Sequence, residues 1–323
     1  MVVDLPLYPE SAAERDRWVL SQRPERNQLN PRQPYAFHVE SERAASGELV
    51  PVATIFLTNR ECPWRCLMCD LWRNTLTESL PTGAIPEQIR FALSRLPPAR
   101  QIKLYNSGSF FDTRAVPAAD YEAIAAQVAS FERAIVECHP SLIGDRCLRF
   151  RDLLGGQLEV AIGLETVHPV ALERLNKQMT TGQFAKAAEY LREHAIDLRV
   201  FVLVQPPFIG PGEALHWAER SLDFAFDCGA TAVTLIPTRA GNGAMDRLLQ
   251  AGEFTPPSLQ TVEDALDYGV GLKRGRVFVD LWDIDRIATC PECRAKRIAR
   301  LAAINASQGL SDETQCESCG GRR

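Results

Sequence analysis

The sequence predicts an α/β protein whose parallel strands form an open sheet or a partial barrel. Short apolar and β-branched runs recur along the 323 residues, and segments with helical spacing of apolar residues lie between most of them. With 46% hydrophobic and 24% charged residues, the composition is that of a globular protein and not of a disordered or coiled-coil chain. Parallel strands joined by right-handed crossovers place an active site at their carboxyl ends.

Each predicted element follows from its own local pattern. We expect strands at residues 50–57, 101–105, 134–137, 158–164, 198–204, 231–236 and 276–281. We expect helices at residues 86–96, 118–133, 184–194, 213–228 and 258–268, with Thr181 as the cap of the third. These elements define a core at residues 50–287, after a lead segment at 1–49 and before a tail at 288–323.

The amino-terminal residues lack the basic start and the apolar stretch of a secretory signal, and no segment has the apolar length of a membrane span. We therefore expect a cytoplasmic protein without a membrane partner. The formal net charge of −5 argues against broad binding to a phosphate backbone. In a reducing compartment, clustered cysteines bind metal or do chemistry more often than they form disulfides, and this chain has ten cysteines.

Three of these cysteines follow the first predicted strand. Cys62, Cys66 and Cys69 form a C-x3-C-x2-C motif in TNRECPWRCLMCD. Three thiolates can hold an iron–sulfur cube and leave one iron without a protein ligand, so that the open iron can chelate a small molecule. The alternatives are buried thiols or a zinc knuckle, for which His139 is a possible fourth ligand.

This motif after the first strand of a βα array resembles the radical S-adenosylmethionine (radical SAM) superfamily. The resemblance implies a partial (β/α)6-type parallel barrel. It also implies a [4Fe-4S] cluster on Cys62, Cys66 and Cys69, with S-adenosylmethionine bound to the open iron. In that superfamily one electron from the cluster, supplied by an external electron donor, cleaves the cofactor to a 5′-deoxyadenosyl radical.

The resemblance also implies contacts to S-adenosylmethionine at several strand ends. Ser107, Gly108 and Ser109 in LYNSGSFFD take the place of the glycine-rich motif that meets the amino group of the cofactor. Gly163 and Glu165 in IGLET share one strand face, and Glu165 resembles the acid that contacts the ribose or the amino group. A solvated strand end is the alternative for Glu165.

Further cofactor-binding residues are implied elsewhere. Met68 precedes the last cluster cysteine, where the superfamily usually has an aromatic residue, and methionine can still pack against adenine. Gln205 and Phe208 lie in LVQPPFIGPGE, which resembles a cofactor-contacting turn. Arg199, earlier on that strand, either pairs with a carboxylate or faces solvent.

Three residues are candidates for a catalytic role. Glu137 and His139 share one face at the end of the third strand, in IVECHP. Lys177, in RLNKQMT, resembles a basic residue near the cofactor carboxylate or the substrate; a solvated helix end is the alternative.

Stretches such as YNSGSFFD, VAIGLET, LNKQMT and VQPPFIGPGEA resemble one branch of the superfamily, over residues 50–270. This branch includes the radical enzyme of archaeosine biosynthesis and, more distantly, the catalytic subunit of elongator. Those enzymes act on tRNA, so the resemblance implies a tRNA partner, a modified 7-deazaguanine-type base as substrate and a partner enzyme in tRNA modification. The segment before GEFTPPSL is short and weakly basic and the net charge is negative, so a small-molecule biosynthetic intermediate stays open as substrate.

The tail contains two further pairs of cysteines. Cys290 and Cys293 are separated by 22 residues from Cys316 and Cys319, a spacing typical of a four-thiolate zinc site. An auxiliary Fe-S cluster uses the same ligands. The helix between the pairs carries a basic stripe, which is either a solvated face or a phosphate contact, made of Arg294, Lys296, Arg297 and Arg300.

The remaining cysteines, Cys138, Cys147 and Cys228, are expected in the apolar core. If both cysteine groups are structural, the chain is instead a non-catalytic zinc-binding nucleic-acid adaptor.

Overall fold

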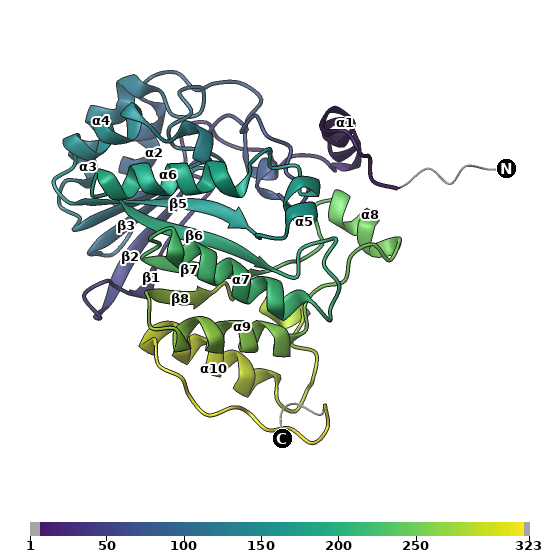
Figure 1. Ribbon diagram of the computed structural model, residues 1–323. Coiled ribbons are helices and arrows are strands. Elements are labelled where there is room, and N and C mark those ends of the chain that lie inside the picture. Colours follow the sequence, from purple (N-terminus) through teal and green to yellow (C-terminus); the bar gives the residue numbers. More distant parts are fainter. Residues whose placement is uncertain (1–6, 320–323) are drawn as a thin grey trace.

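The computed structural model describes residues 7–319 and contains a curved, half-barrel sheet of eight strands (Figure 1). The strands lie in the sheet in their order along the chain. The first pair is antiparallel and each later pair is parallel, which confirms the predicted α/β class. The strands are β1 (Ala36–Arg43), β2 (Leu49–Phe56), β3 (Gln101–Tyr105), β4 (Arg133–Glu137), β5 (Gln157–Glu165), β6 (Asp197–Val204), β7 (Ala232–Pro237) and β8 (Arg276–Val279).

The seven predicted strands are confirmed as β2 to β8, and their ends differ by no more than two residues from the prediction. The sequence analysis missed β1, which lies inside the predicted lead segment. The two faces of this strand, AFHVESER, carry different side chains: apolar residues lie on one face and carboxylates on the other. Phe37 and Val39 pack against the main hydrophobic cluster, whereas Glu40 and Glu42 pair with Lys103 on the other face. A strand that buries the carboxylate of Glu42 looks like a polar surface segment in sequence.

Helices cover one face of the sheet through this same hydrophobic cluster (Figure 1). All five predicted helices are present. The predicted helix 118–133 ends early, because the chain turns into β4 at Arg133, and Thr180 rather than Thr181 caps α6, with Gln183 completing a capping box. The helices are α1 (Ala12–Gln22), α2 (Ala84–Leu93), α3 (Tyr121–Val128), α4 (Asp145–Leu153), α5 (Pro169–Arg174), α6 (Thr181–Glu193), α7 (Ala214–Asp227), α8 (Ala244–Gln250), α9 (Leu259–Gly271) and α10 (Arg294–Ser307).

Alternation along the strands divides the sheet into a helix-covered face and an inner face. On β5, Val160 and Ile162 pack with the helices, and each such buried side chain contributes about 1.5–3 kcal/mol to stability. The alternate residues Glu159, Ala161 and Gly163 point the other way by strand geometry. The inner face is therefore where the polar residues of this sheet are buried.

Buried ion pairs fill the inner face near the amino ends of the parallel strands. Glu159 is fully buried and contacts Arg199 (2.6 Å), Arg133 (3.2 Å) and Arg276 (3.3 Å). Glu42 of β1 binds Arg199 at 2.5 Å. Burial alone would raise the pKa of Glu42, but Arg199 and Lys103 hold that pKa well below its usual range. We call this group the charged floor; its carboxylates are Glu40, Glu42, Glu159 and Asp197, and its cations are Lys103, Arg133, Arg199 and Arg276.

An aromatic layer occupies the inner face next to the charged floor. The ring of Phe56 lies 5.5 Å from Tyr35 and 6.1 Å from Tyr105, and Tyr105 lies 6.4 Å from Phe201. These distances are typical of interacting aromatic pairs. Among the described residues, no helix combines the length and the apolar character needed to cross a membrane.

Candidate functional site

Most of the predicted site residues lie at the carboxyl edge of the parallel strands. The cysteine loop follows β2, Ser107 follows β3, Glu165 ends β5 and Gln205 follows β6. Three of these residues have left-handed backbone conformations, with φ of 54° at Ser107, 66° at Glu165 and 54° at Gln205. Such strained conformations in non-glycine residues concentrate at functional sites.

The three cysteines of the first motif lie close enough to influence one another electrostatically. Burial raises the pKa of all three thiols, to about 12 for Cys69, and the neighbouring cysteines raise those of Cys66 and Cys69 further. The Lys177 ammonium opposes this shift at Cys62 and Cys66. The three thiols are soft ligands of the kind that hold an iron–sulfur group, and the Lys177 ammonium favours the thiolate forms of Cys62 and Cys66.

The loop after β3 is built around a carboxylate and a close backbone approach. Glu137 Oε1 accepts hydrogen bonds from the backbone N–H groups of Asn106 (2.7 Å) and Gly108 (3.2 Å). Burial raises the pKa of Glu137 to about 7, although these hydrogen bonds oppose the shift. A Cβ atom on Gly108 would lie 2.9 Å from the Cβ of Cys62, so only glycine fits here without displacing the cysteine loop.

The two serines of this loop also have partners. Ser107 Oγ lies 3.0 Å from the hydroxyl of Tyr35, and Ser109 Oγ accepts a hydrogen bond of 2.9 Å from the backbone N–H of His139. Ser109 therefore ties the loop after β3 to the loop after β4.

His139 joins the cysteine loop to the segment that carries Lys177. Its ring stacks on Trp64 at 3.7 Å with an interplanar angle of 13°. Nδ1 accepts from the backbone N–H of Ser141 (3.2 Å), and Nε2 lies 3.1 Å from the carbonyl oxygen of Lys177. Burial and the Lys177 charge lower the pKa of His139 to about 4, so the ring is neutral at pH 7. Because both ring nitrogens have these partners, His139 is not oriented as a fourth zinc ligand for the cysteine loop.

A buried ion pair lies between the cysteines and β5. Lys177 Nζ donates to Glu165 Oε1 at 2.5 Å, and both side chains are about nine-tenths buried. A Cβ on Gly163 would lie 2.1 Å from Glu165 Oε1 and 2.2 Å from Lys177 Nζ, so the missing side chain of Gly163 provides the space for the pair. Burial lowers the pKa of Lys177, but Glu165 and Cys66 outweigh it and the pKa is raised, so the ammonium is retained. Glu165 is therefore not at a solvated strand end, and Lys177 is not at a solvated helix end.

Four predicted cofactor-binding residues lie elsewhere or have structural partners. Arg199 is held by Glu42 and Glu159 in the charged floor, so of the two expectations for it the pairing with a carboxylate is confirmed. Gln205 Nε2 donates to the carbonyl oxygen of Thr255 at 2.8 Å. Met68 and Phe208 pack in a second hydrophobic cluster that includes residues of α1 and α8.

Several residues of the site were missed in the sequence. Trp64 and Tyr35 contact predicted site residues, but each lacks a spacing signal. The position of Trp64 between Cys62 and Cys66 is a clue, because an aromatic ring inside a ligand loop needs a packing partner.

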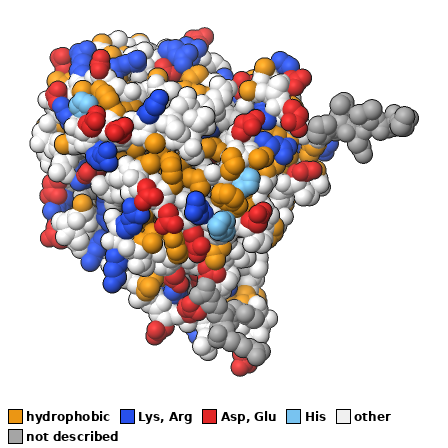
Figure 2. All heavy atoms as spheres, viewed as in Figure 1, with side chains coloured by type: hydrophobic (Ala, Val, Ile, Leu, Met, Phe, Trp, Pro, Cys, Tyr) orange, Lys and Arg blue, Asp and Glu red, His pale blue; other side chains and the backbone are white. Residues whose placement is uncertain are grey.

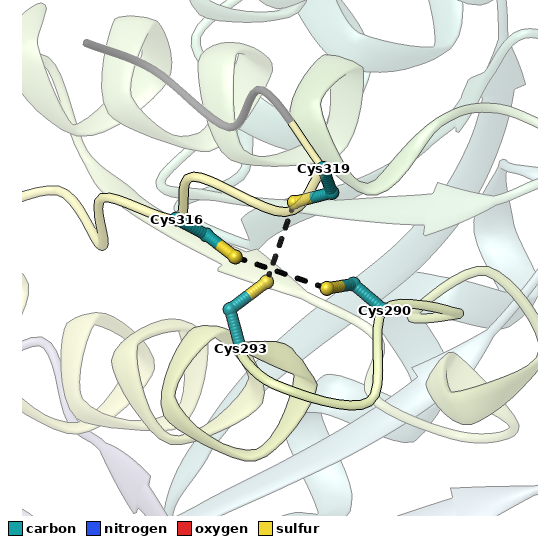
Figure 3. Close-up of side chains that lie close together, drawn as sticks. All are labelled: Cys290, Cys293, Cys316 and Cys319. Carbon is teal, nitrogen blue, oxygen red and sulfur yellow. Dashed lines mark hydrogen bonds between the residues drawn. The ribbon is translucent and has the colours of Figure 1, made fainter.

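The four cysteines of the tail converge into a compact group (Figure 3). Their sulfur atoms all lie within 4.8 Å of one another, with 3.8 Å between Cys290 and Cys316 and 3.6 Å between Cys293 and Cys319. Hydrogen bonds from the backbone N–H groups of Cys293 and Glu292 lower the pKa of Cys290 to about 7. A tetrahedron with metal–sulfur distances of about 2.3 Å has edges of about 3.8 Å, so this spacing fits one tetrahedral ion.

The basic stripe of the tail helix requires a correction. Arg297 and Arg300 are each only 7% exposed. Arg297 binds Glu263 of α9 at 2.5 Å, and Arg300 binds Asp267 of α9 at 2.8 Å. These two arginines dock α10 on α9, and they form neither a solvated face nor a phosphate contact. Only Arg294 and Lys296 of the stripe are exposed.

No family model matches the chain. It is 24% identical over 229 residues to an uncharacterised protein of Methanocaldococcus jannaschii, covering 66% of this chain and 63% of that protein. It is 24% identical over 236 residues to archaeosine synthase subunit beta of Methanosarcina acetivorans, covering 68% of this chain and 67% of the relative. The chain thus spans about two thirds of the length of the curated relatives it matches.

Among solved structures, the archaeal Elp3 of Methanocaldococcus infernus superposes with a TM-score of 0.48 at 13% identity, covering 60% of this chain and 51% of that one. The sequence relatives confirm the resemblance expected from the motifs.

Proposed function

We propose that this chain is a radical SAM enzyme that acts on a modified, 7-deazaguanine-type base of tRNA. The observation that supports the proposal is that the loop of Cys62, Cys66 and Cys69, which packs against Gly108, and the Lys177–Glu165 pair lie at the same carboxyl edge of a parallel sheet. Apolar residues would stabilise this part of the core at least as well as three soft ligands and a buried cation. The presence of these groups here therefore indicates a function.

The residues present fit the cofactors of such an enzyme. Cys62, Cys66 and Cys69 would hold a [4Fe-4S] cluster, and the narrow approach at Gly108 would bring the backbone of the loop after β3 against it. When bound, the cluster supplies the electron that cleaves S-adenosylmethionine to a 5′-deoxyadenosyl radical, which abstracts hydrogen from the substrate. Lys177 and Glu165 offer one cationic and one anionic group for the carboxylate and amino groups of S-adenosylmethionine.

In this proposal Glu137 and His139 act by position. Glu137 orders the backbone N–H groups of the loop after β3, and neutral His139 holds Trp64 against the segment of Lys177. The aromatic layer would present flat apolar ring faces to a bound substrate.

The substrate proposal has two supports. The relative from Methanosarcina acetivorans is named archaeosine synthase subunit beta, and the word subunit also supports a partner enzyme in tRNA modification. The aromatic layer suits a planar base. The second candidate is a small-molecule biosynthetic intermediate. It is favoured by the internal pairing of Arg297 and Arg300, which removes the basic stripe that RNA would contact.

We further propose that the tail, residues 288–323, binds zinc and follows a catalytic core at residues 50–287 and a lead segment at 1–49. The sulfur spacing of Cys290, Cys293, Cys316 and Cys319 supports a single ion over an auxiliary Fe-S cluster, because a cube would bind each thiolate at a separate corner and hold the sulfurs farther apart. None of the ten cysteines, all of which lie in residues 7–319, forms a disulfide, and this supports a reducing, cytoplasmic location.

The test of the activity is a single cysteine variant. The parent chain and Cys66→Ala are reconstituted with iron and sulfide without oxygen, reduced with dithionite, and assayed for 5′-deoxyadenosine from S-adenosylmethionine. We expect the variant to lose the product, and Cys228→Ala, a cysteine at the end of α7, to keep it. Equal rates in Cys66→Ala and in the parent would contradict the proposed cluster site.

The test of the substrate compares small RNA with a metabolite extract in anaerobic turnover, scored by new masses. RNA affinity that falls steeply with salt supports tRNA, since phosphate contacts release counterions. Turnover of the extract without RNA binding at low salt supports the small-molecule alternative.

A further inference from the structure

A surface hollow of about 390 Å³ opens beside the cysteine loop. Cys62 forms part of its lining, together with four arginines, Arg26, Arg60, Arg65 and Arg114. We call it the arginine hollow. A group of positive side chains is unexpected on a chain whose formal net charge is −5.

Carboxylates neutralise the arginine hollow only in part. Glu61 is shared by three guanidiniums, those of Arg23 (2.7 Å), Arg65 (3.0 Å) and Arg26. Arg114 pairs with Asp112 at 3.0 Å and its side chain is 52% exposed. The side chain of Arg60 contacts the neutral hydroxyl of Ser79 at 3.3 Å. Five arginines therefore stand against two carboxylates, and the region keeps a local positive charge.

Hydrogen bonds connect the arginine hollow to the cysteine loop. Arg65 Nη1 donates to the carbonyl oxygen of Cys62 at 2.6 Å and to that of Trp64 at 3.1 Å. Glu61, which organises the arginines, directly precedes Cys62 in the chain. A molecule seated in the hollow therefore lies against a cysteine ligand itself.

We propose that the arginine hollow docks an acidic one-electron carrier protein, of the small flavin or iron–sulfur type, that reduces the cluster. This inference rests on the proposed function. In the step the carrier loses one electron and the cluster gains it, and no bond or proton is transferred. Electron tunnelling weakens steeply with distance, so contact next to Cys62 gives a short path.

Two features favour a carrier over RNA as the occupant. The four arginines that line the hollow lie in one compact group, whereas RNA binding requires charges spaced along a backbone. Electron-transfer complexes are small and weak, with interfaces below about 1,200 Å², and charge complementarity mainly speeds their association.

The test is a charge reversal, Arg60→Glu together with Arg114→Glu. The matched control is Arg149→Glu with Arg192→Glu, two arginines on α4 and α6 that are 56% and 62% exposed. Reduction of the cluster by flavodoxin hydroquinone is followed by stopped-flow absorbance, in parallel with reduction by dithionite. We expect the reversal to slow reduction by flavodoxin at least tenfold at low salt, with dithionite reduction unchanged and the control like the parent.

Binding gives a second readout that does not need the cluster. Calorimetry of flavodoxin with the cluster-free chain should show an affinity that falls with salt and is lost in the reversal variant. Parent-like flavodoxin binding and reduction in that variant would overturn the proposal. Loss of RNA affinity with unchanged flavodoxin binding would overturn it in favour of an RNA site. If the parent forms no cluster or does not cleave S-adenosylmethionine with dithionite, the proposed function itself fails.

Discussion

Replacing Glu159 with glutamine should strongly destabilise the protein. Glu159 is fully buried and contacts the guanidiniums of Arg133, Arg199 and Arg276 within 3.3 Å. The charged floor has equal numbers of carboxylates and cations, and glutamine keeps the shape of the side chain while removing one negative charge. The variant therefore leaves one buried positive charge without compensation.

Breaking a buried ion pair from one side costs about 3–5 kcal/mol. The entropy of unfolding is about 2.1 cal/mol/K per residue, which gives about 0.7 kcal/mol/K for 323 residues. A loss of about 4 kcal/mol thus lowers Tm by about 6 °C.

Urea unfolding and calorimetry of the parent and Glu159→Gln measure this difference. The matched control is Glu122→Gln; the side chain of Glu122 is 73% exposed and its carboxylate lies 3.6 Å from Arg149. We expect the control to stay within about 0.5 kcal/mol of the parent. A loss below about 1 kcal/mol in Glu159→Gln would refute the reasoning, because it would mean that water screens the charged floor.

Three further predictions concern the site and the tail. The pKa of His139 is lowered to about 4 in the folded chain, so the stabilisation from its neutral ring is complete above about pH 6.5 and is lost as the pH falls through 4. In urea unfolding, the stability advantage of the cluster-free parent over His139→Gln should shrink by up to about 3 kcal/mol from pH 7 to 4. A difference that stays constant with pH would contradict this. Gly108→Ala should displace Cys62 and at least halve the iron bound on reconstitution, whereas Gly182→Ala, with no contact closer than 3.9 Å, should bind iron like the parent; equal iron in both argues against the close approach. Cys293→Ser should lose about one zinc per chain and keep the iron of the core in metal analysis, and a parent with about eight irons and no zinc would show that the tail holds an Fe-S cluster.

The sequence predicted those features whose signals are local. Runs of β-branched residues marked all seven parallel strands, and the spacing of Cys62, Cys66 and Cys69 marked the edge where the site lies. Glycines were also informative, because Gly108 and Gly163 stand where the backbone must approach a ligand loop or make space for an ion pair.

Features that depend on distant partners were not predictable in this way. In the sequence, Arg297 and Arg300 belong to a basic stripe. In the structure they pair with Glu263 and Asp267 of α9, which no local pattern indicates. The strand β1 was missed for the same reason, since the carboxylate of Glu42 is buried only because Lys103 and Arg199, from other strands, pair with it. A charged residue in sequence indicates a surface unless its partner is known.

The strand β1 also constrains the order in which the chain can fold. Glu42 meets its partner Arg199 only 157 residues later, and Arg276 bonds back to Arg43 across 233 residues. During synthesis the β1–β2 hairpin emerges before the other strands and keeps its carboxylates in water until those strands arrive. Assembly of the charged floor then requires that these carboxylates and the arginines are desolvated together. This assembly therefore comes late and makes folding slow, as expected for contacts of long sequence separation. A nascent chain that stalls before β8 leaves Glu42 and Glu159 short of a cation, and such intermediates are natural targets for chaperones.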